Sequence, residues 1–234
     1  MKYKAHVFLA LALLASLAGP AFASWAVMSP DAEVKVAKGT MTVKPTAEWN
    51  RSSLRPSRRS EAWTRDGVNL NELTFFGAIG DGESILRQGY TITEKLPKFK
   101  ADMLPTDITE MFEATNRIVL QSPVFKMGKV EPAKLGSHDG VRFSYSYSAQ
   151  AEDIERRGEA VAAIVEGRLY IVNFVAPSLH YFDAGIGEVR TMVEGITINP
   201  PKAKVVTDAK AKKKKRSGVP MAVPMVISVP AEKK

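Results

Sequence analysis

The stretch "EAVAAIVEGRLYIVNFVAP", residues 159–177, decides the fold. It contains two apolar segments that are separated only by Glu166 and Gly167. A glycine-containing connection this short makes an antiparallel hairpin. Both segments are apolar on both faces, which is typical of strands in the middle of a sheet that is covered on both sides. We therefore predict a central, architectural hairpin, and we expect Asn173, the one internal polar residue of its second strand, to form a hydrogen bond in the core.

Working outward from this hairpin, the preceding segment "VRFSYSYSA", residues 141–149, alternates strictly between apolar or aromatic and polar side chains. Such alternation predicts a strand with one buried and one polar face. Weaker strand patterns cover residues 39–50, 69–79 and 125–135. Together with the hairpin, these segments predict an antiparallel, twisted sheet of about six strands.

Two further segments have helical periodicity. In "PTDITEMFEATNRIVL", residues 105–120, apolar side chains recur at the spacing of one helix face, and Thr106 is a candidate N-cap. In "HYFDAGIGEVRTMVEGI", residues 180–196, the same spacing runs from Phe182 to Ile196. We therefore predict an α+β domain in which helices flank the sheet.

The first residues have the three parts of a secretory signal peptide. Lys2 and Lys4 precede an apolar run, and the small-residue motif Ala21-Phe22-Ala23 follows it. The run is too short to cross a hydrocarbon core, and no later apolar run of the chain has spanning length. We therefore expect cleavage after Ala23, and a periplasmic or secreted mature protein without a transmembrane segment.

Positive charge is concentrated at the other end of the chain. The formal net charge is +8, yet residues 24–199 contain 21 basic and 23 acidic residues, whereas residues 200–234 contain ten basic and two acidic ones. A block of like charge followed by a proline-interrupted apolar run does not form a packed core. We therefore expect a folded domain over residues 24–199 and a disordered tail over residues 200–234. The tail is a candidate for peripheral contact with anionic lipid or lipopolysaccharide through Lys212, Lys213, Lys214, Lys215 and Arg216.

An arginine-rich segment, "RSSLRPSRRSEAWTRDG" at residues 51–67, reads as a polar loop because of Pro56 and its many charges. The simpler interpretation is a solvated surface. The alternative is a flap that binds an anionic ligand, since guanidinium groups match phosphate and carboxylate geometry. Its candidate ligand-binding residues are Arg51, Arg55, Arg58, Arg59 and Arg65.

Residues suited to catalysis are sparse. The chain has no cysteine, so disulfides, thiol nucleophiles and cysteine-ligated metals are excluded. His138 and His180 with Asp183 could supply a hydrolase or metal site only if they met in space. Ser137 or Ser178 could complete a Ser-His-Asp set, but neither serine lies in a G-x-S-x-G nucleophile elbow. We therefore predict no catalytic residues, no cofactor and no metal. A periplasmic hydrolase or metal-dependent enzyme that uses His138, His180 and Asp183 is the alternative.

The order of elements resembles the PsbP-like superfamily, which includes the DcrB-type bacterial envelope proteins. The resemblance is strongest over residues 139–196, in "DGVRFSYSY", "GEAVAAIVEGRLYIVNFVAP" and "YFDAGIGEVRTMVEGI". It implies a compact antiparallel sheet flanked by helices, in proteins that mostly act as accessory or binding modules. This chain lacks the lipid-attachment cysteine of the bacterial lipoprotein members and adds the arginine-rich segment and the basic tail.

These observations predict an exported, non-catalytic protein of the cell envelope. We expect it to bind another envelope protein or an anionic envelope component. Nucleic acid is an unlikely partner, because the folded part has no basic excess and the protein is expected to be exported.

Overall fold

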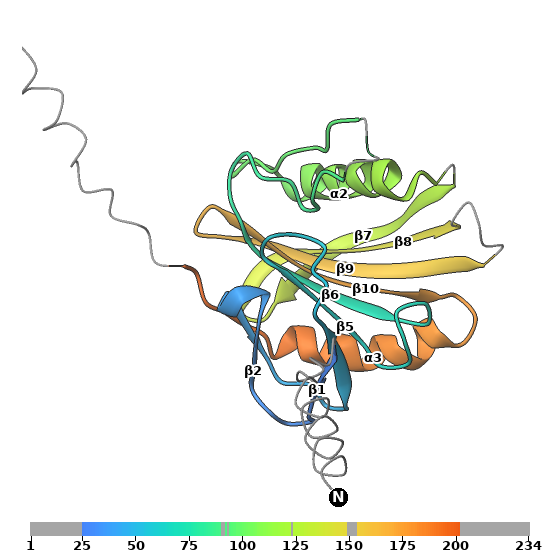
Figure 1. Ribbon diagram of the computed structural model, residues 1–234. Helices are drawn as coiled ribbons and strands as arrows, with labels where there is room; N and C mark the ends of the chain where they lie inside the picture. Colours follow the sequence, from blue (N-terminus) through green and yellow to red (C-terminus); the bar gives the residue numbers. More distant parts are fainter. Residues whose placement is uncertain (1–24, 90–91, 93, 123, 149–153, 202–234) are drawn as a thin grey trace, which may run out of the picture. The chain divides into compact units, whose positions relative to one another are not determined.

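The computed structural model describes residues 25–89, 92, 94–122, 124–148 and 154–201 (Figure 1). The predicted signal peptide and nearly all of the predicted tail lie outside these residues. The elements, in chain order, are β1 (Trp25–Met28), β2 (Val34–Val36), a short 3-10 helix (Ala37–Gly39), β3 (Met41–Val43), β4 (Trp49–Ser52), β5 (Ser60–Thr64), β6 (Glu72–Ile79), α2 (Pro105–Leu120), β7 (Phe125–Leu135), β8 (His138–Ser148), β9 (Glu155–Val165), β10 (Arg168–Pro177), α3 (Tyr181–Glu194) and β11 (Thr197–Ile198).

The described residues form an α+β fold, as predicted, but the main sheet is larger than the six strands expected. It has eight strands in the order β1-β4-β5-β6-β10-β9-β8-β7, and neighbouring strands are antiparallel. One of the two additional strands is β1, which the sequence did not predict, and the other lies in the arginine-rich segment, which was predicted to be a loop. That segment is residues 51–67. It contains the end of β4 and all of β5, whose five residues are buried.

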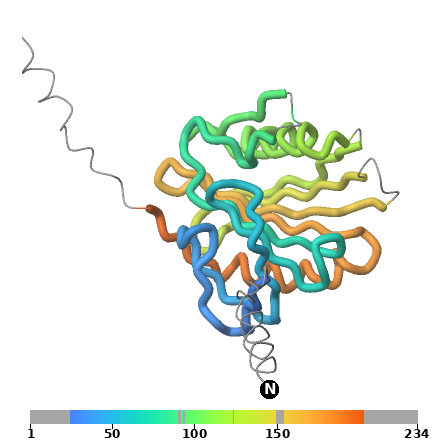
Figure 2. The backbone as a smooth tube through the Cα atoms, viewed as in Figure 1, coloured from blue at the N-terminus to red at the C-terminus, as the bar shows by residue number. Residues whose placement is uncertain are grey.

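A second, three-stranded sheet has the order β11-β3-β2. It joins the two ends of the described chain, because β11 near residue 198 pairs with β3 near residue 41 (Figure 2). The segment predicted as one strand over residues 39–50 is therefore divided between this small sheet and strand β4 of the large one.

The central hairpin is confirmed. β9 and β10 pair over ten consecutive positions, from Arg168 opposite Val165 to Pro177 opposite Arg156. The intervening Glu166 and Gly167 both have positive φ, 50° and 67°, which is typical of the tight two-residue turn that joins twisted strands. Almost every residue of β10 is buried, so the hairpin is covered on both faces as expected.

The two helices lie on opposite faces of the large sheet (Figure 1). On one face, α3 packs against β10 with Phe182, Ile186, Val189 and Val193, in a cluster that also contains the buried side chains of the small sheet. On the other face, the cluster around α2 contains Ile108, Met111 and Phe112. The sheet therefore separates two apolar cores.

Two local predictions have different outcomes. Asn173 accepts a hydrogen bond from the Tyr145 hydroxyl over 2.8 Å in a buried position, which confirms the expected core amide. Thr106 is not the N-cap of α2, because the helix begins one residue earlier, at Pro105. The carboxylate of Asp107 accepts the backbone N–H of Leu104 over 2.8 Å and satisfies one of the free donors at this end.

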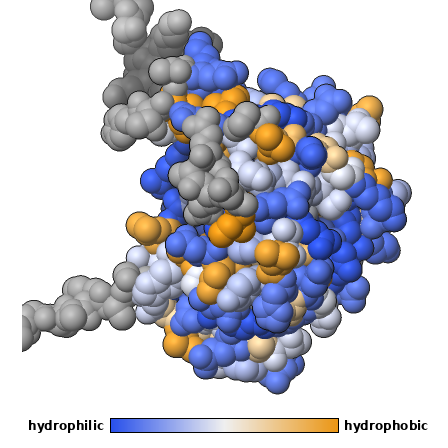
Figure 3. Space-filling model, turned by 90° about the vertical axis from the view of Figure 1, so that its right-hand side faces the viewer, coloured by the Kyte–Doolittle hydropathy of each residue, from blue (hydrophilic) through white to orange (hydrophobic). Residues whose placement is uncertain are grey.

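The surface of the described residues is mixed in polarity. On the face drawn in Figure 3, hydrophobic side chains form separate patches between hydrophilic ones. Neither α2 nor α3 is long and apolar enough to cross a membrane, and the described residues contain no other helix that could do so.

Candidate functional site: a charged concavity on β7, β8 and β9

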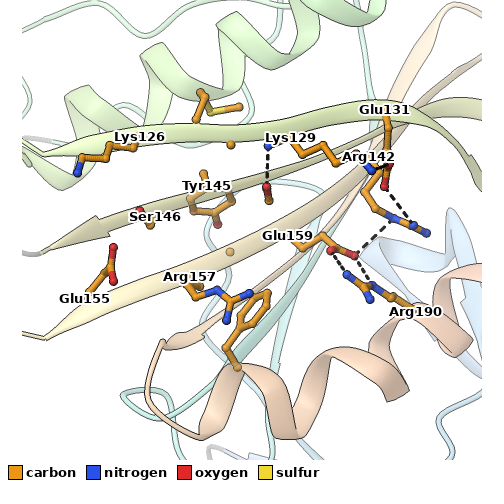
Figure 4. A pocket seen from close by; sticks show the side chains of 15 residues that line it. Lys126, Lys129, Glu131, Arg142, Tyr145, Ser146, Glu155, Arg157, Glu159 and Arg190 are labelled. Carbon is orange, nitrogen blue, oxygen red and sulfur yellow. Dashed lines mark hydrogen bonds and ion pairs between the residues drawn. The ribbon is translucent and has the colours of Figure 1, made fainter.

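A concavity of about 540 Å³ lies on the part of the sheet formed by β7, β8 and β9, beside α3 (Figure 4). Its base includes the small residues Gly128, Ser144 and Ser146. The alternation in β8 turns its apolar and aromatic side chains to the α2 core, which leaves the polar positions for the other face. The charged residues of the concavity are Lys126, Lys129, Arg142, Arg157 and Arg190, and Glu131, Glu155 and Glu159.

Glu159 is the centre of the charged network. The guanidinium group of Arg190 on α3 forms a bidentate contact with this carboxylate. Nε donates to Oε1 over 2.9 Å, and Nη2 donates to Oε2 over 2.5 Å. Arg142 Nε lies 3.4 Å from Oε1. The Glu159 side chain is only 8% exposed, so two guanidinium groups balance a nearly buried carboxylate. The hydrogen bond from Arg190 to Glu159 raises the pKa of the Arg190 guanidinium, which therefore stays charged.

A second carboxylate, Glu131 on β7, is also paired. Lys129 Nζ lies 2.5 Å from one of its oxygens, and Arg142 Nη1 lies 3.7 Å from the other. The hydrogen bond from Lys129 lowers the pKa of Glu131, and the charges of Lys129 and Arg142 act in the same direction. Glu131 therefore remains ionised at neutral pH and links the edge of the sheet to Arg142.

A β-bulge in β7 gives this edge its shape. The pairing of β7 with β8 shifts register between Met127 and Val130. A side chain at Gly128 would lie 2.5 Å from Ser144 Oγ, so only glycine permits this approach. The Ser144 hydroxyl accepts the backbone N–H of Lys129 over 3.0 Å, which fixes the bulge. Bulges commonly redirect side chains at functional sites.

Arg157 connects the concavity to the first turn of α3. Its guanidinium lies 4.4 Å from the centre of the Phe182 ring and donates a hydrogen bond to Asp183 over 3.0 Å. Glu155 and Arg157 both belong to β9. Because its side chain is still 45% exposed, Arg157 can contact a partner in the concavity.

The side chains that line the concavity carry a net positive charge. Five basic and three acidic side chains line it, and the carboxylates of Glu131 and Glu159 are held in ion pairs. Lys126 and Glu155 have no ion pair among the described residues. Figure 4 shows Arg142, Glu159 and Arg190 gathered at one end, and Lys126 at the other. Ion-paired side chains and the hydroxyls of Ser144 and Ser146 make up most of its polar lining.

The five arginines singled out from the sequence do not converge on one site. Arg51 lies 3.7 Å from Glu61, and Arg65 donates to Glu188 over 2.8 Å. Arg55 is exposed and lines a shallow apolar hollow with Trp25 and Leu54, among others. Only Arg58 and Arg59 line the same cavity, a smaller one than the concavity. Ligand binding by these arginines stays a prediction.

The two histidines lie at opposite ends of α3. His180 is the N-cap of that helix, and Asp183 in its first turn pairs with Arg157. His138 begins β8 after a turn in which Gly136 N–H donates to the carbonyl of Val193, at the other end of the helix. A helix of 14 residues is about 20 Å long. The structure therefore does not bring the three residues together, and the described residues contain no group of histidines and carboxylates suited to hold a metal ion.

Comparison with known proteins gives similarities of fold. No family model matches the chain, and no curated protein sequence matches it significantly. Among solved structures, the chain is similar to a protein from Bacteroides thetaiotaomicron, with a TM-score of 0.43 and 9% identity over 74% of this chain. It spans 49% of that protein, about half its length.

Two further solved structures are covered almost completely. One is cyanobacterial PsbP from Synechocystis, with a TM-score of 0.46 and 13% identity over 77% of this chain and 95% of that one. The other is LpqN from Mycobacterium tuberculosis, described as involved in cell envelope biogenesis, with a TM-score of 0.31 and 12% identity over 79% of this chain and 88% of that one. All three TM-scores lie below 0.5, so function is argued below from this protein's own side chains. A PsbP protein is thus among the structures to which the chain is similar, as the sequence resemblance implied, and the narrower DcrB-type assignment stays a prediction.

Proposed function

We propose that this protein is an exported, non-catalytic accessory module of the cell envelope, which binds an acidic segment of another envelope protein in the concavity on β7, β8 and β9. The observation that carries the proposal is the charge arrangement there. The carboxylates of Glu131 and Glu159 are held by Lys129, Arg142 and Arg190, whereas Lys126 and Glu155 have no such pair among the described residues. Five basic and three acidic side chains line the concavity, so a partner meets a surface of net positive charge.

The shape of the concavity supports an extended partner. Its glycine and serine base lets a polymer approach the sheet closely, and the hydroxyl of Ser146 can hydrogen-bond to a backbone or a carboxylate. Each exposed ion pair contributes only about 0.2–1 kcal/mol, so stable binding requires several of them at once. Such binding weakens as salt screens the charges.

Reversal of charge at Lys126 and Lys129 tests the proposal. A photo-crosslinking residue at Ser146 captures the partner in living cells, in the otherwise unchanged chain and in the Lys126→Glu/Lys129→Glu variant. We expect the crosslinked species to disappear in that variant and on washing at high salt. The matched control, Lys95→Glu/Lys98→Glu, changes two exposed lysines in the segment before α2 and should leave the crosslinks unchanged. Identical crosslinks in all three proteins would exclude the concavity as the docking site.

Contact of the basic tail with anionic lipid or lipopolysaccharide is a separate part of the proposal, since the tail lies outside the described residues. It is tested by replacing Lys212 to Lys215 and Arg216 with glutamine in the full chain and fractionating the cells. Release from membranes without loss of the Ser146 crosslinks would assign lipid contact to the tail and protein contact to the concavity. Unchanged fractionation would remove the tail from the proposal.

A further inference from the structure

A second, smaller cavity lies between two loops on the other half of the large sheet. Its volume is about 210 Å³, and it is lined by residues 57–59 before β5, by Ile79, and by Glu83, Ser84, Leu86 and Arg87 after β6. Three arginines contribute to it, Arg58, Arg59 and Arg87. Only the first two were singled out from the sequence. Two strands, β5 and β6, separate Arg87 from them in the sequence, and Arg87 comes close only through the fold.

One of the three guanidinium groups is neutralised inside the site. Arg59 Nη1 donates to Glu83 over 3.1 Å and to the carbonyl of Ala78 over 2.6 Å. The same carboxylate oxygen of Glu83 accepts the backbone N–H of Gly80 over 2.8 Å. Arg58 and Arg87 have no ion-pair partner among the described residues. The cavity therefore has a surplus of two positive charges.

The loops that carry these charges are fixed by the backbone. Arg87 N–H donates to the carbonyl of Pro56 over 3.3 Å, which ties the second loop to the first. Ser57 is buried, and its backbone N–H donates to Ser60 Oγ over 2.6 Å. The two free guanidinium groups are therefore attached to a preorganised frame, which lowers the entropy cost of binding a ligand.

The strand beside the cavity is strained at the same place. Ala78 has φ of +50°, in the left-handed region that non-glycine residues seldom adopt. The pairing of β10 with β6 also shifts register between Leu169 and Ile171, opposite this point. The bulge turns the carbonyl of Ala78 toward Arg59. Strained residues and bulges are concentrated at functional sites.

We propose that this cavity binds a phosphate-sized oxyanion, either as free phosphate or as the phosphate group of a lipid or phosphomonoester. The guanidinium groups of Arg58 and Arg87 and the hydroxyls of Ser57 and Ser84 supply donors from several directions. A tetrahedral anion with three or four acceptor oxygens matches such a set better than a planar carboxylate, which one guanidinium can satisfy. This site is independent of the concavity on β7, β8 and β9, and binding to it goes beyond the docking function proposed above.

Titration calorimetry of the purified full-length mature protein with inorganic phosphate tests this site. We expect saturable binding of one phosphate, weakened by about tenfold or more in the Arg58→Gln/Arg87→Gln variant, because two charge-assisted contacts are lost. Both side chains are on exposed residues, so the variant should unfold at the temperature of the unchanged protein, and thermal denaturation checks this. The matched control is Arg55→Gln, an exposed arginine on the same loop that does not line the cavity, and it should bind phosphate normally.

Vesicles distinguish the two sources of the anion. Flotation with phosphatidylcholine vesicles that contain phosphatidic acid, with and without added inorganic phosphate, shows whether a lipid phosphate occupies the site. Flotation that depends on Arg58 and Arg87 and is competed by phosphate identifies a headgroup site, whereas phosphate binding without flotation identifies a free-phosphate site. Absence of phosphate binding, or equal binding by the folded double variant, would overturn the proposal. The Lys126→Glu/Lys129→Glu protein should retain phosphate binding, so failure of the docking function leaves this result unaffected.

Discussion

The aromatic ring of Tyr145 lies directly over Gly158 on the neighbouring strand. A methyl group at position 158 would be only 2.1 Å from Tyr145 Cζ, well inside contact distance. The missing side chain lets the ring of Tyr145 cross β9 and place its hydroxyl 2.8 Å from Asn173 Oδ1 on β10. One glycine thus allows a hydrogen bond that spans three strands in the core.

Replacing Gly158 with alanine should therefore destabilise the protein. The ring must move and the buried amide of Asn173 loses its donor, so we expect the free energy of unfolding to fall by about 1–3 kcal/mol in urea denaturation. Gly187→Ala is the matched control. Gly187 lies within α3, and a methyl group added there would have nothing within 4 Å, so alanine should raise stability by about 0.5–1 kcal/mol. Equal losses at both positions would contradict the packing described.

Removing the hydroxyl group should change the free energy of unfolding differently at two buried tyrosines, Tyr145 and Tyr170. Tyr145→Phe removes the partner of Asn173 and should cost about 0.5–1.5 kcal/mol of unfolding free energy. The Tyr170 hydroxyl is buried without a hydrogen-bond partner among the described residues, so Tyr170→Phe should be neutral or stabilising. Measuring the denaturant midpoints of the two variants together shows which variant is the less stable. A larger loss for Tyr170→Phe would show that its hydroxyl has a partner.

The parts of the fold that could be predicted depend on local periodicity. Alternation in β8 and the apolar hairpin of β9 and β10 fixed which side chains face each core, and the 3.6-residue pattern located both helices. Each of these signals lies within one segment of the chain. They required no knowledge of what packs against that segment.

The arginine-rich segment shows why the rest could not be predicted. Strand β5, "SEAWT", is buried at all five positions without being apolar, so it has no alternating pattern. Its Glu61 accepts the indole N–H of Trp63 over 3.0 Å and lies near Arg51, while Arg65 binds Glu188 from α3. Partners 123 residues apart cannot be read from local sequence. The hydrogen bonds from Arg190 to Glu159 likewise join residues that are far apart in the sequence, so local sequence does not reveal them either.

The ion pairs of Glu131 predict a dependence of stability on pH. Because Lys129 lowers the pKa of Glu131 in the folded protein, its stabilising effect is fully present above the usual glutamate pKa. It is lost as the pH falls through the lowered folded value. Thermal denaturation of the unchanged protein and Glu131→Gln should therefore differ at neutral pH and converge in acid. A difference that is independent of pH, or grows in acid, would contradict the pairing.

Metal analysis tests the alternative of a metal-dependent enzyme. Since His138 and His180 lie at opposite ends of α3, they cannot ligate one ion without rearrangement of the helix. We expect the metal content of the purified protein, measured by inductively coupled plasma analysis, to be unchanged by His138→Ala and by His180→Ala. A stoichiometric metal that is lost in either variant would establish the metal site and remove the docking proposal's claim that the protein is non-catalytic.

The carboxylate of Glu159 should matter more to stability than either of its arginines. Glu159→Gln leaves Arg142 and Arg190 facing each other without the charge that balances them, and we expect a loss of about 1–3 kcal/mol. Arg190→Ala should cost less, because Arg142 Nε remains 3.4 Å from Glu159 and the Arg190 side chain is half-exposed. Urea denaturation of both single variants and the double variant gives the coupling energy of the pair. Additive losses would mean that Glu159 and Arg190 act separately and would contradict the pairing described.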